Sequence, residues 1–87
     1  MFAHRFLVMG CNSVGVYAHA VRLVDSSITG CAESGVLLGS GRLIGSKLTG
    51  SSADIEASEA PSLLHTTCEH SRQLTTQEPL GICSLDP

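Results

Sequence analysis

The segment HTTCEH at positions 65–70 gathers residue types that bind transition metals. His65, Cys68 and His70 lie close together in it, and Cys83 could supply a fourth ligand. Imidazole and thiolate groups are zinc ligands, but this spacing matches none of the usual zinc patterns. On a strand, Cys68 and His70 would project to one side and His65 to the other. We therefore expect solvated histidines, with no metal and no other cofactor.

Acid–base and nucleophilic chemistry find little support in the sequence. Cleavage of an acidic polysaccharide needs a base and cations that neutralise the uronate, and a calcium site would need clustered carboxylates. The chain has no D-x-D pair, no G-x-S-x-G nucleophile turn and no G-x-G-x-x-G phosphate loop. Its acidic residues are dispersed, among them Asp25, Glu33, Asp54, Glu56 and Glu59. We expect no catalytic residue in this chain.

Arg22 and Arg42 form the most suggestive pair of charged residues. They lie twenty positions apart, each in an Arg-Leu dipeptide. If the two residues stack on neighbouring turns of a repeat, they form a short cationic ladder that can pair with a carboxylate. The alternative is a pair of exposed arginines that extend over apolar neighbours and whose positive charge is partly offset by Asp25. Arg22 and Arg42 are the candidate ligand-binding residues.

These candidates must be positioned by a repeat of about twenty residues. VRLVDSSITGCAESGVLLGS (21–40) is followed at once by the similar GRLIGSKLTGSSADIEASEA (41–60). Ile55 comes nineteen residues after its counterpart Val36, so one residue is lost in the third unit, and the register is recovered later. The expected core columns are Val8, Ile28 and Leu48; Val16 and Val36; and Leu23, Leu43 and Leu63.

A period near twenty excludes most repeat folds. Leucine-rich repeats need an L-x-x-L-x-L-x-x-N frame that is absent, and helical repeats are longer. Short β-branched runs between Gly and Ser predict strands joined by sharp bends, although a β-sandwich is an alternative. The sequence predicts an all-β, single-stranded, right-handed parallel β-helix of about 3–4 coils of roughly 20 residues. The coils would span residues 1–65, and a loop-rich closing segment would span 66–87.

Charge and hydropathy limit the partners. The net charge is −3, and the 5 Lys and Arg residues do not cluster. We therefore expect neither nucleic-acid binding nor a polybasic membrane anchor. No apolar run approaches the roughly 18 residues of a membrane span. The apolar part of MFAHRFLVMG is too short for a signal peptide, so an export signal would lie outside this chain.

Residues 8–60 resemble the degenerate coils of right-handed parallel β-helix proteins, the pectin-lyase-like superfamily. The tail TTCEHSRQLTTQEPLGIC (66–83) is similar to the closing segment of many uncharacterised bacterial β-helix proteins. There, Thr-Thr-Cys is followed after a polar loop by Trp-Gly-x-Cys, whereas Leu80 stands here in place of the Trp. The resemblance implies that this chain is the carboxy-terminal part of a longer, exported solenoid.

The 4 cysteines allow three disulfide pairings. The resemblance implies a bond between Cys68 and Cys83, which would clip the loop 69–82 onto the last coil. Cys11 and Cys31 occupy equivalent positions on adjacent coils, where parallel stacked side chains rarely present the dihedral angle of a disulfide. We expect two unbonded thiols there. A Cys68–Cys83 bond would indicate an oxidising compartment, namely the periplasm, the cell surface or the medium.

Two functional hypotheses follow. The first is a structural or binding solenoid from an exported bacterial protein, without catalytic activity, that contacts a glycan or a cell-surface protein. The alternative, implied by the resemblance, is the terminal part of a polysaccharide lyase, hydrolase or epimerase whose active site lies in upstream coils. Because Met1 to Met9 shows no capping helix, we expect an open amino-terminal edge. Upstream coils of the parent chain or another copy would pair with this edge.

Overall fold

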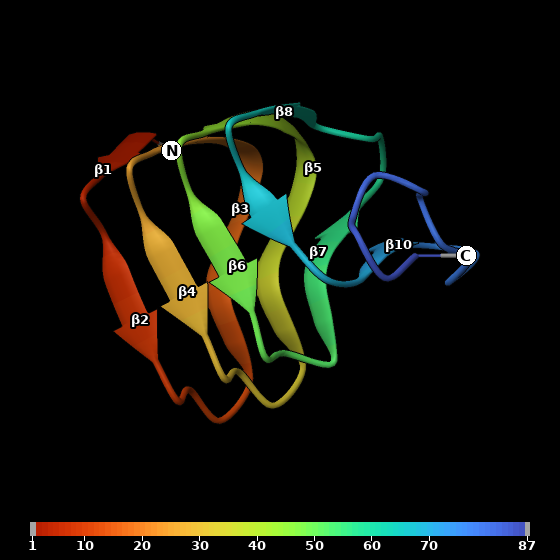
Figure 1. Cartoon of the computed structure of the whole chain (residues 1–87). Helices are drawn as coiled ribbons and strands as arrows, with labels where there is room; N and C mark the ends of the chain where they lie inside the picture. Colours follow the sequence, from red (N-terminus) through yellow and green to blue (C-terminus); the bar gives the residue numbers. More distant parts are fainter. Residues whose placement is uncertain (1, 87) are drawn as a thin grey trace.

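The computed structural model describes residues 2–86, and these form parallel strands with no helix among them. The chain winds through about four turns of a β-solenoid in which paired residues of successive turns are about twenty positions apart (Figure 1). The predicted all-β parallel solenoid is confirmed. Short β-branched segments between bends can satisfy their backbone groups only on neighbouring turns, and this produces the stack.

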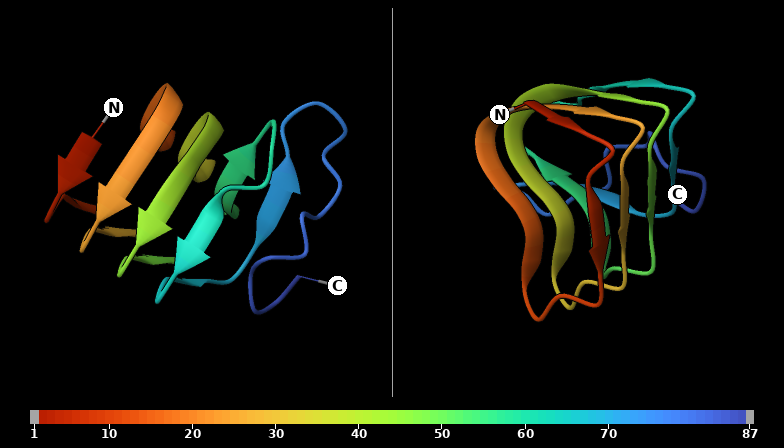
Figure 2. Two further views of the ribbon diagram at one scale, coloured as in Figure 1. Left: turned by 90° about the horizontal axis from the view of Figure 1, so that it is seen from above. Right: turned by 90° about the vertical axis from the view of Figure 1, so that its left-hand side faces the viewer.

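Strands from successive turns form two sheets. The larger sheet contains β1 (Phe2–His4), β3 (Val14–Val24), β5 (Ser34–Ile44), β7 (Ala53–Ala57), β8 (Ser62–Leu64) and β10 (Ser71–Gln73). The smaller sheet contains β2 (Leu7–Met9), β4 (Ser27–Thr29), β6 (Lys47–Thr49) and β9 (Thr67–Cys68). The view along the stack shows that the long strands β3 and β5 bend in the middle (Figure 2).

The two halves of β3 and β5 have different neighbours, so the solenoid has three walls. The first halves, residues 14–18 and 34–38, pair with each other. The second of them also pairs with β7, which in turn pairs with β10. The second halves, residues 20–24 and 40–44, lie between β1 and β8. We refer to this second group of strands as the arginine wall, because it carries Arg22 and Arg42. The smaller sheet is the short-strand wall.

The strand register follows the repeat in the sequence. The central column of the short-strand wall contains Val8, Ile28, Leu48 and Cys68. In the third turn, Val36 pairs with Ile55 at a separation of nineteen, whereas Leu43 pairs with Leu63 at a separation of twenty. One residue is therefore missing before β7 and is regained before β8, in agreement with the predicted register.

Aliphatic side chains from all three walls fill the interior. The fully buried ones are Leu23, Ile28, Val36, Leu38, Leu43, Leu48 and Ile55. Val16 is also buried, whereas Val8 and Leu63 are half-buried. Val8 belongs to the first turn, which has a neighbouring turn on one side only. Burial of these aliphatic side chains is the main source of stability in a fold with few aromatic residues.

A glycine allows the close approach of β3 and β5 at their bend. A Cβ atom at Gly41 would lie only 2.2 Å from the carbonyl oxygen of Val21 on the neighbouring strand. One turn later the same position is Pro61, which has no N–H to donate. In this turn two shorter strands replace the long one: β7 ends at Ala57, and β8 begins at Ser62, directly after the proline.

A column of hydroxyl groups joins the turns at the bend between the arginine wall and the short-strand wall. The N–H of Phe6 donates to the hydroxyl of Ser26 at 3.1 Å, and the N–H of Ser26 donates to that of Ser46 at 3.2 Å. The N–H of Ser46 donates to the hydroxyl of Thr66 at 3.4 Å. Ser26, Ser46 and Thr66, which we term the hydroxyl column, thereby satisfy backbone amides at the bends.

Residues 78–86 cover the last turn of the solenoid (Figure 2). The N–H groups of Ser84 and Leu85 donate to the carbonyl oxygens of Cys68 and Glu69, at 3.0 and 2.8 Å. Two carbonyl groups of the last turn, which follow the short-strand wall, are therefore satisfied by the closing segment.

Candidate functional site

Arg22 and Arg42 lie directly opposite each other on β3 and β5. Adjacent strands are separated by about 4.8 Å, so the two side chains leave the wall as close neighbours. Both are exposed, and the guanidinium carbon of Arg22 lies 5.6 Å from the centre of the Phe2 ring. The ion pairs among residues 2–86 involve other cations, so both guanidinium groups are open to an external anion.

A row of apolar side chains runs beside the two arginines. Residues two apart on a strand share a face, so Val24 and Ile44 lie on the same outer face as Arg22 and Arg42. Val24 and Ile44 are half-buried, and Leu64, the next residue in this row, is 54% exposed. The arginine wall therefore presents a cationic row and a parallel apolar row on one surface.

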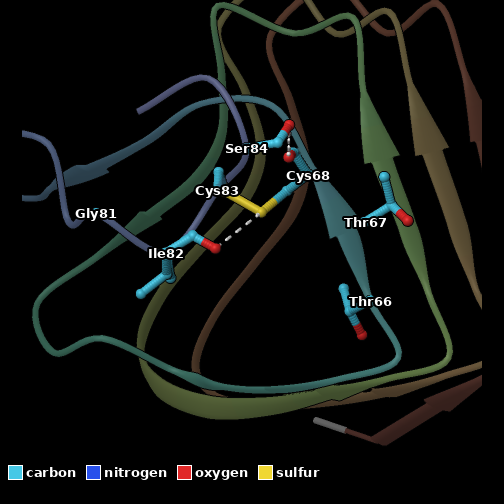
Figure 3. A pocket seen from close by; sticks show the side chains of 7 residues that line it. All are labelled: Thr66, Thr67, Cys68, Gly81, Ile82, Cys83 and Ser84. Atoms are coloured by element: carbon cyan, nitrogen blue, oxygen red, sulfur yellow. Dashed lines mark hydrogen bonds between the residues drawn. A yellow bond between two sulfur atoms is a disulfide. The ribbon is translucent and has the colours of Figure 1, made fainter. Parts of the chain in front are cut away.

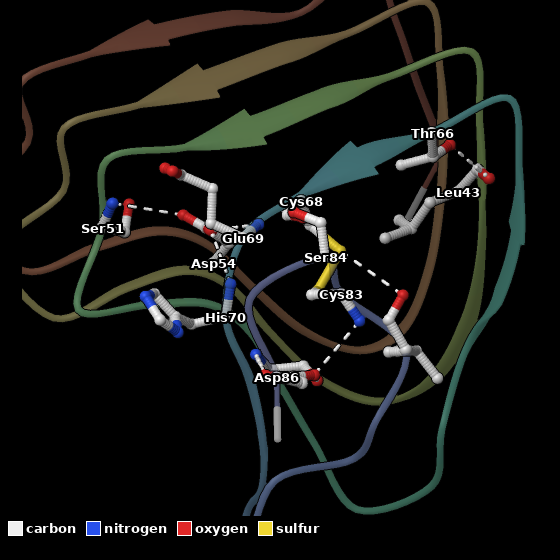
Figure 4. The surroundings of a disulfide bond; sticks show 12 residues. Leu43, Ser51, Asp54, Thr66, Cys68, Glu69, His70, Cys83, Ser84 and Asp86 are labelled. Carbon is white, nitrogen blue, oxygen red and sulfur yellow. Dashed lines mark hydrogen bonds between the residues drawn. A yellow bond between two sulfur atoms is a disulfide. The ribbon is translucent and has the colours of Figure 1, made fainter.

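Asp54 is fully buried and binds backbone amides. One of its carboxylate oxygens accepts the N–H of Ser51 at 3.1 Å. The other accepts the N–H groups of Glu69 and His70, at 2.8 and 3.1 Å (Figure 4). Asp54 thus joins the bend before β7 to the bend before β10. Its role is structural, since both oxygens are occupied by the chain itself.

Glu56 is a second carboxylate that the fold uses internally, and its side chain is only 8% exposed. It accepts hydrogen bonds from Ser34 Oγ at 2.9 Å, from Arg72 Nε at 2.8 Å and from Gln77 Nε2 at 3.0 Å. Burial alone would raise the pKa of Glu56, but these hydrogen bonds and the charge of Arg72 lower it below its ordinary value. A carboxylate held in its ionised form in this way is poorly suited to act as a general base.

An open hollow of about 430 Å³ lies beside the Cys68–Cys83 disulfide (Figure 3). Its lining consists of Thr66, Thr67, Cys68, Gly81, Ile82, Cys83 and Ser84. All of these residues are neutral, and the two cysteines are bonded to each other. The hollow therefore offers hydroxyl groups but no charged side chain and no free thiol.

The HTTCEH segment does not assemble a metal site. Cys68 and Cys83 lie at disulfide distance, with an S–S separation of 2.02 Å, as the resemblance implied. His65 and His70 are exposed at bends. Within residues 2–86, no three side chains of His, Cys, Asp or Glu come together in a way that could hold a metal ion.

The expectation that Cys11 and Cys31 are unbonded is wrong. We expected two unbonded thiols, but their Cα atoms are 4.5 Å apart and their sulfur atoms are bonded at 2.11 Å. Both cysteines lie in bends, after β2 and after β4, so the side chains are not held in the parallel orientation of a pleated strand. Together with Cys68 and Cys83, this second pair favours an oxidising, extracellular environment.

Asp86 has a structural role that the sequence did not indicate. It accepts the N–H of Ser71 at 2.8 Å, the hydroxyl of the same residue, and the N–H of Cys83 at 3.1 Å. Burial would raise the pKa of Asp86, but hydrogen bonds from Ser71, Cys83 and Ile82 lower it. No local motif marks this aspartate. The hydroxyl column, by contrast, had a visible signal, the twenty-residue spacing of its members.

Comparison with known proteins finds no relative, since no family model, no curated protein and no solved structure matches the chain. In the part of the chain that the structure describes, no helix has the length and apolar character needed to cross a membrane. The structure shows the parallel solenoid, and none of these comparisons confirms the expected membership of the pectin-lyase-like superfamily.

Proposed function

We propose that this chain is a structural and binding module of an exported bacterial protein, and that its arginine wall contacts an acidic polysaccharide. The observation that carries the proposal is the pair Arg22 and Arg42. They stand in register on adjacent strands, both are exposed, and neither has an ion-pair partner among residues 2–86. Solvated cations in a fixed row are suited to recognising repeated anionic groups.

An acidic polysaccharide is complementary to both rows of this wall. Each guanidinium group can donate two parallel hydrogen bonds to a carboxylate, and the rigid sheet fixes the separation of the two groups. The apolar row formed by Val24, Ile44 and Leu64 can contact the non-polar faces of the sugar rings. A neutral glycan would engage only that apolar row. Charge would therefore select the ligand.

The two cysteine pairs support the exported setting. Disulfides persist in oxidising compartments and are rare where thiols are kept reduced. Cys11–Cys31 joins the first two turns, and Cys68–Cys83 joins the closing segment to the last turn. The bacterial origin is supported by the similarity of that closing segment to those of bacterial β-helix proteins.

Binding of defined oligosaccharides tests the proposal. The purified chain would be titrated with an oligogalacturonate and with a neutral glucan of equal length, by calorimetry and by NMR. We expect the acidic oligomer to bind, and its affinity to fall as salt is raised. The double variant Arg22→Gln/Arg42→Gln should weaken binding by more than about tenfold, because each charge-assisted hydrogen bond contributes about 1.5–3 kcal/mol.

Lys47→Gln is the matched control, because Lys47 is an exposed cation on the short-strand wall. It should bind as tightly as the unmodified chain. An equal loss in both variants, or equal binding of the neutral glucan, would contradict the proposed site. The same incubation addresses the enzymatic alternative. Unsaturated or shortened products formed at an enzymatic rate would favour a polysaccharide lyase or hydrolase over a binding module.

A further inference from the structure

The two ends of the solenoid differ. The closing segment covers the last turn, whereas β1 and β2 are the end strands of the two sheets at the opposite end (Figures 1 and 2). Within residues 2–86, no strand pairs with the outer edges of β1 and β2. An open strand edge is a template for pairing with another chain.

Exposed apolar side chains gather on this first turn. Leu7 is 63% exposed and Met9 is 72% exposed. The residues in register with them on β4 are Ser27 and Thr29, and the corresponding residues on β6 are polar as well. Phe6, which is 37% exposed, likewise occupies the position that the hydroxyl column fills with Ser26 and Ser46 in the next turns. On the outer face of the short-strand wall, the exposed apolar side chains of β2 are therefore followed by polar residues on β4 and β6.

We propose that β2 pairs antiparallel with β2 of a second copy of this chain, about a two-fold axis that passes beside Val8. Leu7 of one copy then lies opposite Met9 of the other, and Val8 lies opposite Val8. Such an interface uses the same patch on both copies and closes on itself. The short-strand wall becomes one continuous sheet through the dimer. The arginine wall is not involved, so this inference stands apart from glycan binding.

The backbone of β2 has the directions that this pairing needs. The carbonyl of Phe6 accepts a hydrogen bond from β4 at 2.8 Å, and the N–H of Gly10 donates to the end of β4 at 2.9 Å. Because backbone groups alternate in direction along a strand, the N–H and C=O groups of Leu7 and Met9 face the open edge. With Leu7 opposite Met9, each of the two symmetric pairs exchanges two hydrogen bonds, and Val8 forms the non-bonded pair between them.

The side chains around the axis are complementary. Gly10 lies in the bend after β2, where a Cβ atom would meet nothing within 4 Å, so the Phe6 ring of the other copy has room beside it. Leu7, Val8 and Met9 carry no charge, so like charges do not meet between the paired strands.

The hydroxyl column does not continue into the first turn. In each later turn, the hydroxyl at this position accepts the N–H of the turn before. Phe6 occupies the position in the first turn and has no side-chain acceptor. A preceding coil with the same geometry would lose that hydrogen bond. An antiparallel β2 pair does not require it.

The size of the end face indicates a reversible dimer. The two shorter dimensions of the molecule are 24 and 22 Å. They limit the face to on the order of 500 Å² per copy, which lies at the lower end of specific interfaces. We therefore expect monomer and dimer in exchange.

Sedimentation equilibrium over a range of concentrations tests the dimer. Leu7→Ser/Met9→Thr installs the residues that β4 carries at these positions, so it is compatible with the fold, and it should raise the dimer dissociation constant by more than about tenfold. Leu7→Pro removes an N–H that faces the open edge and should have the same effect. Leu85→Ser, which removes an apolar side chain that is 57% exposed at the other end, should leave the dimer unchanged.

A monomer at millimolar concentration, open-ended assembly, or an equal effect of Leu85→Ser would overturn the proposal. Cross-linking tests the register independently. In the proposed pairing the two Val8 Cα atoms are about 4.5 Å apart, within disulfide range, whereas the two Met9 Cα atoms are beyond about 7 Å. Mild oxidation should therefore convert Val8→Cys, but not Met9→Cys, into a covalent dimer. Equal cross-linking of the two variants would exclude this register.

Discussion

The N–H of Ser26 donates a hydrogen bond to the hydroxyl of Ser46, twenty residues further along the chain, at 3.2 Å. Both residues are buried. The Ser46 hydroxyl in turn donates to the carbonyl oxygen of Ile44 at 3.1 Å. One small side chain therefore satisfies an amide of the preceding turn and a carbonyl of its own turn. Such contacts satisfy backbone groups at the bend, as the strand pairing does along the walls.

Ser46→Ala should destabilise the solenoid, because it leaves the buried N–H of Ser26 without an acceptor. An unsatisfied buried donor costs about 1–3 kcal/mol, and urea denaturation would measure the loss. Ser62→Ala removes an exposed hydroxyl from β8 and should have little effect. Ser46→Thr keeps the acceptor and should recover most of the stability. If Ser46→Ala is as stable as Ser62→Ala, the hydroxyl column is not structural.

Acid should weaken the fold through Glu56 and Asp86. The pKa of each is lowered in the folded state, so the ionised carboxylates contribute stability that is fully present above their ordinary pKa values, about 4.3 and 3.9. This contribution is lost as pH falls through the folded-state pKa values. We expect the free energy of unfolding to decline below about pH 4.3, as followed by urea denaturation at a series of pH values.

The same pH series distinguishes the buried carboxylate from an exposed one. Glu56→Gln should be less stable at neutral pH, since it loses the charge that pairs with Arg72, and its stability should decline less steeply in acid. Glu59→Gln, at an exposed position, should reproduce the unmodified profile. A Glu56→Gln profile as steep as that of the unmodified chain would contradict this assignment.

Gly41→Ala should destabilise the bend in β5. The added methyl group would lie 2.2 Å from the Val21 carbonyl oxygen, so the strands must separate to accommodate it. Overpacking of this kind costs about 1–3 kcal/mol, and the thermal midpoint would fall accordingly. Ser40→Ala, at the adjacent exposed position, is the control and should leave the midpoint nearly unchanged. Equal midpoints for the two variants would show that the strand relaxes freely.

The stacking of turns could be predicted from the sequence because it is periodic and apolar. Val36 and Ile55 were expected to share a column despite their separation of nineteen, and the structure pairs them. Each such position repeats a requirement for an inward aliphatic side chain, so several turns indicate the same register. The exposure of Arg22 and Arg42 follows from that alternation as well.

The contacts made by bends and by the closing segment could not be predicted in this way. Asp25, Gly45 and His65 occupy equivalent bends in successive turns, and all have positive φ values, of 50°, 59° and 49°. The three residue types differ, so the sequence does not reveal that this conformation repeats. The pairing of Cys11 with Cys31 depends on side-chain orientation outside the strands. The site of Asp86 depends on how the last residues fold back, and no other turn repeats that arrangement.

The two disulfides should contribute similar stability but protect different parts of the chain. They close loops of 20 and 15 residues, so each contributes about 3 kcal/mol by the chain-entropy estimate. Cys68→Ser/Cys83→Ser should also release the closing segment and expose the edge of the last turn. We therefore expect rapid amide exchange and proteolysis within residues 78–86 in that variant. Cys11→Ser/Cys31→Ser should lose comparable stability in urea while the closing segment stays protected. Release of the segment in both variants, or in neither, would show that the Cys68–Cys83 bond does not hold it in place.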